Sequence, residues 1–128
     1  MSDKFTVEII SPDKTISKQE TNEVIIPSFE GQMGILNNHI PLITFLRPGI
    51  ITIKAEGEKK YYVEEGTVEF SNNNLLILTS TARDLANLDK SKINELLLKA
   101  EANLKTQSTD KERYITSYKL ETLKEISQ

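Results

Sequence analysis

The only histidine of the chain, His39, lies in the densest group of residues that could take part in chemistry. The segment reads FEGQMGILNNHIPLI (residues 29–43) and combines this imidazole with two glycines, an asparagine pair and a proline. An imidazole acts as a general acid or base when a nucleophile or an orienting carboxylate lies beside it. The neighbouring sequence offers neither. We therefore interpret His39 first as a loop residue hydrogen-bonded to nearby backbone, second as a contact to a partner, and only third as catalytic.

The rest of the sequence lacks the patterns on which catalysis and cofactor binding depend. Without cysteine there is no thiolate nucleophile or zinc thiolate, and one histidine cannot form a two-histidine metal site. Glycine-rich phosphate loops and the G-x-S-x-G turn are also absent. Neighbouring strand residues point to opposite faces, which separates the carboxylates of Glu64 and Glu65 and places one ring of Tyr61 and Tyr62 inside and one outside. We expect no enzymatic activity, no cofactor and no metal site.

Length and charge narrow the class of protein further. A chain of 128 residues forms one domain, or a small domain with an appendage. A net charge of −3 argues against a nucleic-acid or anionic-membrane partner, which requires clustered Lys and Arg. No apolar run approaches the roughly 20 residues that span a bilayer, and the first residues do not resemble a targeting segment. Together with the absence of cysteine, these features predict a soluble protein of a reducing compartment.

The secondary structure that positions His39 and its neighbours falls into two groups. The sequence pattern of the first two thirds of the chain predicts β-strands. Apolar and polar residues alternate in short runs that are separated by glycines, by Ser11-Pro12-Asp13 and by an asparagine triplet. Pro27 should end its run, because it lacks the N–H that a continuing ladder needs. This spacing favours an antiparallel sandwich or barrel. The predicted strands cover residues 5–10, 15–19, 23–26, 50–55, 60–64, 67–70 and 75–79.

From Leu88 onward the apolar period becomes that of an α-helix. Asp89 or Ser91 can cap the first helix, and Ser108, Thr109 or Asp110 can cap a second that runs to about Ile126. The polar residues 105–110 form the bend between them, which predicts an antiparallel hairpin. The hairpin is either a fixed lid on the sheet or a moving part. The predicted apolar stripes are Ile93, Leu96, Leu97, Ala100 and Leu104, then Tyr114, Ile115, Tyr118, Thr122, Leu123 and Ile126.

In its wider setting the opening segment resembles a known family. Residues 24–53, VIIPSFEGQMGILNNHIPLITFLRPGIITI, are similar to the epsilon subunit of bacterial F-type ATP synthases, which is homologous to the mitochondrial delta subunit. Residues 5–14 and 64–82 are similar to the first and the last strands of that family's sandwich. The resemblance therefore covers nearly the whole chain. The residues in register are Gly31, Gly34, Ile35, His39, Pro41, Leu42, Ile43, Leu46, Pro48 and Gly49.

The resemblance implies a fold and a role. The fold is a mixed one, with an N-terminal antiparallel β-sandwich of about ten strands (residues 1–84) and a C-terminal antiparallel helical hairpin (residues 88–128). The role is that of a non-catalytic central-stalk, or rotor, subunit that couples proton translocation to ATP synthesis. The expected location is peripheral, on the cytoplasmic face of the bacterial inner membrane, with the membrane reached only through the complex. The implied partners are the gamma subunit, the ring of c subunits and, through the hairpin, the alpha and beta subunits.

The same resemblance assigns residues to contacts. The loop of residues 29–40 is expected to face gamma and the polar loops of the c ring. Asn37-Asn38 replaces the Pro-Gly that many members carry, but asparagine tolerates left-handed backbone, so the turn can survive. The contact candidates are Glu30, Gly31, Gln32, Gly34, Asn37, Asn38, His39 and Pro41.

Two further features of the hairpin follow from the family. Some members bind ATP through [IL]-Asp-x-x-Arg-Ala, and the aligned residues here are Leu88, Asp89, Lys92 and Ile93. Lysine lacks the planar, two-pronged guanidinium and isoleucine adds bulk, which predicts weak or no ATP binding. Basic residues of the second helix can also meet an acidic stretch of the catalytic beta subunit and inhibit hydrolysis. Acidic neighbours make an ordinary salt-bridged solvent face the alternative. The candidates are Lys111, Arg113, Lys119 and Lys124.

Two other hypotheses belong to different classes. One is a free-standing, nucleotide-sensing β-sandwich with a helical lid, and the other is an enzyme of an unrecognised kind. A rotor subunit co-purifies with gamma and the c ring, whereas a sensor is monomeric and responds to its ligand.

Overall fold

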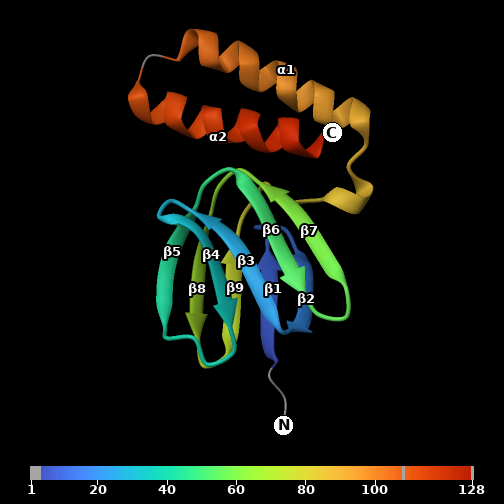
Figure 1. Ribbon diagram of the computed structural model, residues 1–128, viewed down its shortest axis with the longest axis vertical. Coiled ribbons are helices and arrows are strands. Elements are labelled where there is room, and N and C mark those ends of the chain that lie inside the picture. Colours follow the sequence, from blue (N-terminus) through green and yellow to red (C-terminus); the bar gives the residue numbers. More distant parts are fainter. Residues whose placement is uncertain (1–3, 108, 128) are drawn as a thin grey trace.

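A computed structural model of the protein describes residues 4–107 and 109–127. Ten strands are followed by a short 3-10 helix, η1 (Leu85–Asn87), and two α-helices, α1 (Lys90–Thr106) and α2 (Asp110–Ile126) (Figure 1). The predicted order of a β-sandwich followed by a helical hairpin is confirmed. The strands are β1 (Phe5–Ile10), β2 (Thr15–Thr21), β3 (Glu23–Ser28), β4 (Gly31–Leu36), β5 (Leu42–Leu46), β6 (Gly49–Lys54), β7 (Glu58–Val63), β8 (Gly66–Ser71), β9 (Asn74–Leu78) and β10 (Arg83–Asp84).

The strands form one continuous sheet that folds over on itself into two layers (Figure 1). Along the sheet the order is β10, β7, β6, β3, β5, β8, β9, β1 and β2, and β4 pairs with β3 at the side. All pairs are antiparallel except one, because β1 lies parallel to β9. The prediction of an antiparallel sandwich therefore needs this one correction.

The core between the two layers follows from the alternation of apolar residues. Every second residue of each central strand faces inward, as the period of a pleated strand requires. Phe5 and Phe70 meet edge to face with ring centroids 5.6 Å apart, which is a favourable arrangement of two aromatic quadrupoles. The fully buried side chains of this core include Val7, Ile9, Val24, Ile26, Ile35, Ile51, Val63, Val68 and Ile77.

The segment that the sequence predicted as a loop is largely strand. Residues 31–36 form β4, which pairs with β3 along its whole length, and residues 42–46 form β5. The pattern of β4 was obscured by its two glycines, Gly31 and Gly34, which lower strand propensity. Pro27 does not end β3 either. At this proline β3 leaves β6, and the carbonyl of Pro27 accepts a hydrogen bond from the N–H of Arg47 at 2.9 Å.

Both helices begin with side-chain caps. Asp89 accepts a hydrogen bond from the N–H of Lys92 at 2.8 Å, and Thr109 accepts one from the N–H of Glu112 at 3.1 Å. The hydroxyl of Thr109 also donates to the Glu112 carboxylate at 2.7 Å, so these two side chains stabilise the first turn together. The cap predictions of Asp89 and Thr109 are confirmed. Ser108, the third candidate, lies outside the described residues.

The apolar stripe of α1 is confirmed, whereas that of α2 needs correction. Tyr114, predicted to face inward, is 45% exposed. Thr116 and Leu120 are buried instead and were not predicted. Tyr114 lies beside Tyr118, with ring centroids 4.9 Å apart, at the edge of the hairpin. The buried side of α2 is therefore turned away from Tyr114.

The helical hairpin lies across one end of the sandwich (Figure 1). The helices run side by side above β6 and β7, and β1 begins at the opposite end of the sandwich. Within residues 4–107 and 109–127, neither helix has the length and hydropathy needed to cross a membrane.

Gly66 is the glycine at which a side chain is least tolerable. Its φ is +154°, and an added Cβ would lie 2.6 Å from the carbonyl oxygen of Leu78. We expect Gly66→Ala to lower the free energy of unfolding by about 2 kcal/mol, because both the backbone and the contact are incompatible with alanine. Chemical denaturation measures the change. Gly57→Ala is the matched control, since no heavy atom lies within 4 Å of the place that an added Cβ would take, and equal losses in the two variants would contradict the explanation.

Candidate interaction surfaces

The first turn of the segment 29–43 is a tight hairpin between β3 and β4. Ser28 pairs with Gly31, and the hydroxyl of Ser28 donates to the Gly31 carbonyl at 2.7 Å and accepts from the N–H of Glu30 at 3.2 Å. Gly31 has a φ of +120°, which favours glycine. Phe29 and Glu30 form the exposed tip. The N–H of Phe29 donates to the Phe45 carbonyl at 3.1 Å, which fixes this turn beside β5.

The second turn contains the asparagine pair and is held by another asparagine turn. Asn38 has a φ of +63°, and its N–H donates to the side-chain carbonyl of Asn73 at 2.6 Å. The side-chain amide of Asn73 donates back to that of Asn38 at 3.1 Å. Asn72 and Asn73 themselves have positive φ, as a two-residue type I′ hairpin between β8 and β9 requires. We call this arrangement the amide lock, and it ties together residues that are 35 positions apart.

His39 takes a structural role within this second turn. Its Nδ1 donates to the carbonyl of Ile40 at 2.7 Å, and its ring meets that of Phe70 edge to face at 5.9 Å. The ring therefore hydrogen-bonds neighbouring backbone, as the first interpretation predicted. Within the described residues there is no group of three His, Asp or Glu side chains that could hold a metal ion.

The contact candidates do not form one loop. Glu30 and Gly31 lie at the β3–β4 turn, whereas Asn37, Asn38 and His39 lie beyond the other end of β4. The six residues of β4 separate the two turns by about 20 Å. Gln32 and Gly34 are exposed on β4 itself, and Pro41 is exposed just before β5. One turn of the protein therefore cannot bring all eight contact candidates to a single partner surface.

An apolar patch that sequence reasoning missed lies on the outer face of β5 and its neighbours. Ile43 is 75% exposed and Phe45 is 58% exposed, and Leu78 of β9 and Phe29 are exposed as well. Phe29 and Phe45 also line a hollow of about 600 Å³ that Lys111 of α2 borders. The sequence did carry a signal, since LITFL is apolar at positions that face both sides of the strand. Exposed clusters of this kind mark interaction sites. We call these four residues the outer patch.

The contact between the hairpin and the sandwich centres on Tyr62. The ring that alternation places outside the sandwich is fully buried, because the hairpin covers it. It packs in a second apolar cluster with Ala100, Leu120 and Leu123, which is separate from the sandwich core that contains Tyr61. The prediction that one of the two rings faces inward and the other outward is correct for the sheet, but the outward ring, that of Tyr62, does not reach solvent.

Polar contacts surround this apolar centre. The hydroxyl of Tyr62 donates to Glu64 Oε2 at 2.9 Å, and Lys119 Nζ of α2 lies 3.7 Å from Glu64 Oε1. Burial, followed by the charge and hydrogen bond of Glu64, raises the pKa of the Tyr62 phenol, which keeps it a donor. On the other side of α2, the Arg47 guanidinium lies 3.8 Å from the centroid of the Tyr118 ring, a cation–π contact.

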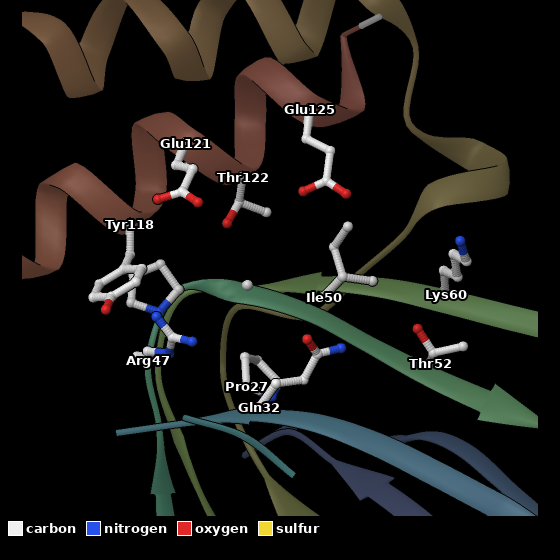
Figure 2. A pocket seen from close by; sticks show the side chains of 12 residues that line it. Pro27, Gln32, Arg47, Ile50, Thr52, Lys60, Tyr118, Glu121, Thr122 and Glu125 are labelled. Carbon is white, nitrogen blue, oxygen red and sulfur yellow. The ribbon is translucent and has the colours of Figure 1, made fainter. Parts of the chain in front are cut away.

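Between these contacts the interface is hollow. A polar cavity of about 500 Å³ separates α2 from β6, with Glu121, Thr122 and Glu125 projecting toward Ile50 and Thr52 (Figure 2). Arg47 and Lys60 lie on the sandwich side of the same space. Tyr62 is therefore the fully buried sandwich residue on which the hairpin packs, and the cavity lies beside it. The mixed charges of the walls show no preference for a phosphate-rich ligand.

The four residues aligned with the ATP motif are used in the fold of the hairpin. Asp89 caps α1, Lys92 pairs with Glu95 at 3.3 Å, and Ile93 is 5% exposed. The N–H of Leu88 donates to the Leu85 carbonyl at 3.3 Å. Lys92 is the one cationic residue of these four, and its ammonium group pairs with the Glu95 carboxylate instead of facing an open phosphate site.

The basic residues of α2 lie in different surroundings. Lys111 and Lys124 are exposed, and Arg113 Nε donates to the Gln107 carbonyl at 3.2 Å. Lys119 alone among them is paired with a carboxylate of the sandwich. The structure thus distributes the four cations and does not gather them on one face.

Comparison with known proteins identifies the family. The sequence model described as "ATP synthase, Delta/Epsilon chain, beta-sandwich domain" matches residues 4–84. A protein named ATP synthase epsilon chain from Pelagibacter ubique is 48% identical over 130 residues, which cover 99% of this chain and all of that relative. One of the same name from Afipia carboxidovorans is 34% identical, covering 97% of this chain and 92% of its own. The chain belongs to the ATP synthase delta/epsilon family.

Solved structures show the same fold. A chain of the Euglena gracilis mitochondrial ATP synthase OSCP/F1/c-ring assembly aligns with a TM-score of 0.75 at 22% identity, covering 97% of this chain and 79% of its own. A chain of the Tetrahymena thermophila mitochondrial ATP synthase central stalk/c-ring aligns with a TM-score of 0.70 at 14% identity, covering 96% of each. At these identities the likeness supports the fold.

We predict that the isolated protein binds ATP weakly or not at all. Asp89, Lys92 and Ile93 are committed to the cap, an ion pair and the buried side of α1. Titration calorimetry with ATP should show no saturation below about 1 mM. The double variant Lys92→Arg with Ile93→Ala restores the family motif and provides the comparison. Micromolar affinity of the unaltered chain would contradict the prediction.

Proposed function

We propose that this protein is the non-catalytic central-stalk subunit of an F-type ATP synthase, which couples proton translocation to ATP synthesis as part of the rotor. The observation that carries the proposal is similarity over the full length to proteins named ATP synthase epsilon chain. A rotor subunit transmits torque and needs rigid contacts with partners more than it needs chemistry. The absence of a catalytic constellation from the sequence agrees with that role.

The outer patch is the surface proposed for the gamma subunit. Isolated apolar residues are common on protein surfaces, but Ile43 and Phe45 share the exposed side of β5, and Phe29 is hydrogen-bonded to Phe45. Leu78 lies two strands away from Phe45, across Thr67. Aromatic side chains of this kind supply much of the binding energy in protein interfaces. Glu30 and Gly31 adjoin Phe29, whose N–H is bonded to β5, and they extend the proposed gamma contact, whereas Gln32 lines the hollow between α2 and β6.

The end of the sandwich away from the hairpin is the surface proposed for the c ring. It carries Asn37, Asn38, His39 and Pro41, together with the β8–β9 turn that the amide lock joins to them. Short polar side chains on a turn fixed by hydrogen bonds suit a ring of hydrophilic loops. In this arrangement the protein is peripheral on the cytoplasmic face of the bacterial inner membrane and reaches the membrane only through the complex.

The helical hairpin is proposed to act as a brake on ATP hydrolysis through the alpha and beta subunits. Lys111, Arg113, Lys119 and Lys124 are the candidates for contact with an acidic stretch of the beta subunit. The support from the structure is the shape of the interface, where one fully buried sandwich residue, Tyr62, joins the apolar cluster of the hairpin and a polar hollow lies beside it. To inhibit hydrolysis in this way, the hairpin must be able to leave the sandwich and reach the alpha and beta subunits.

We predict that Ile43→Glu weakens binding to isolated gamma subunit by about tenfold or more, because a charge would be buried in an apolar contact. Surface plasmon resonance against immobilised gamma measures the change. Leu98→Glu is the matched control, since Leu98 is 70% exposed on α1, away from the outer patch. Equal affinities for the two variants would place the gamma contact elsewhere.

A second prediction concerns the brake. Removing residues 88–128 from the chain in the assembled complex should raise the rate of ATP hydrolysis by about fivefold or more, a typical size for coupling between sites. Proton pumping driven by the enzyme should be retained, because the proposed gamma and c-ring surfaces remain. Unchanged hydrolysis would mean that the hairpin is not a brake.

A further inference from the structure

We propose that Glu64 and Lys119 form a switch: Glu64 holds Lys119 while the hairpin is docked, and Lys119 becomes available to an acidic partner only when this pair breaks. The second half of the inference rests on the proposed braking function. The first half, that the pair keeps the hairpin docked, stands on the contacts of this chain alone.

The apolar cluster under the hairpin consists mainly of side chains from α1 and α2, with few from the sandwich. Ala100, Leu120 and Leu123 bury one another together with Leu96 and Leu97. Of the fully buried residues in this cluster, Tyr62 is the one from the sandwich. Because the two helices pack on each other, the hairpin can move away as a unit, which exposes the Tyr62 ring and the helix side chains that cover it.

The hollow beside Tyr62 leaves polar contacts to fix the position of the hairpin. Glu121, Thr122 and Glu125 line the α2 side of a polar cavity of about 500 Å³, opposite Ile50 and Thr52 of β6 (Figure 2). The attachments on either side are the stacking of Arg47 on Tyr118 and the ion pair of Lys119 with Glu64. Among the described residues, this ion pair is the one in which opposite charges from the hairpin and the sandwich meet.

The surroundings of Glu64 favour this pair over an ordinary surface contact. Both of its oxygens are engaged, Oε2 by the Tyr62 hydroxyl at 2.9 Å and Oε1 by Lys119 at 3.7 Å. The side chains of Lys119 and Glu64 are 24% and 26% exposed, so solvent screens them less than it screens a fully exposed pair. The hydrogen bond from a buried phenol also fixes the carboxylate before Lys119 arrives.

Lys119 cannot pair with Glu64 and with a carboxylate of another subunit at the same time if it reaches that subunit only by leaving the sandwich with the hairpin. Of the four basic residues proposed to meet the beta subunit, it alone is bound to the sandwich, whereas Lys111 and Lys124 are exposed. Docking and inhibition therefore compete for the same ammonium group. Substituting Glu64 should consequently increase inhibition more than substituting Lys119 does, although both changes should loosen the hairpin.

The first test measures docking in the isolated full-length chain. The protein has no cysteine, so a thiol placed at Thr122, which is 8% exposed and lines the hollow, can report undocking by its rate of modification with a bulky maleimide. In this background, Glu64→Gln and Lys119→Met should each raise the rate about fivefold, the size expected for a half-buried ion pair. The double variant should raise it no further than either single change.

Two controls accompany this measurement. Lys124→Met removes an exposed lysine of the same helix and should leave the rate unchanged. A thiol at Ser117, which is exposed on α2, should react equally in all variants. Raising the salt concentration should accelerate modification at Thr122→Cys in the unaltered background and have little effect in the variants, because salt screens the pair. Unchanged rates in both variants, or additive effects in the double variant, would overturn the switch.

The second test measures hydrolysis by the assembled ATP synthase. Glu64→Gln frees a hairpin with Lys119 intact and should lower the hydrolysis rate about fivefold, whereas Lys119→Met should inhibit less than Glu64→Gln. If removal of residues 88–128 activates the enzyme but Glu64→Gln does not inhibit it further, the switch is wrong and the brake stands. If removal of residues 88–128 has no effect, the proposed brake is wrong, and with it the competition for Lys119.

Discussion

The position of the helical hairpin depends on one strand, β7, which buries side chains on both of its faces. Tyr61 points into the sandwich core and Tyr62 points into the cluster under the hairpin, and each is almost completely buried. A strand at a solvated face would expose every second residue. Here the outward ring provides the apolar seat for the helices, and its hydroxyl orients Glu64 beside it. The contacts on either side of the hairpin are arranged around this seat.

Most of the fold follows from the sequence because its period is regular. The alternating runs predicted seven of the ten strands, and the change of period near Leu88 predicted both helices, since amphipathic patterns depend on local spacing. The missed strands have physical reasons. β4 contains two glycines, β5 follows a proline and is apolar on both faces, and β10 has only two residues. A strand that is held by its neighbours needs little propensity of its own.

The interaction surfaces are less accessible to sequence reasoning because they depend on residues far apart in the chain. The amide lock joins Asn38 to Asn73, and the contact of Lys119 with Glu64 joins a helix to a strand. Neither partner carries a pattern that identifies the other. The backbone role of His39 could be predicted, since the sequence offered no catalytic partner. The burial of Tyr62 could not, because alternation fixes the face of a sheet on which a residue lies but not what covers that face.

The one parallel pair of the sheet affects how the chain reaches its native state. β1 lies between β2 and β9, so the first strand completes its hydrogen bonds only with residues 74–78. Contacts between such distant segments slow folding, because a long loop must close before they form. The helices form from local contacts and can fold quickly. They dock on Tyr62 of β7, however, and therefore need a folded sandwich. During synthesis the hairpin also leaves the ribosome after the sandwich. The natural order is therefore sandwich first, with docking of the hairpin as the final step of maturation.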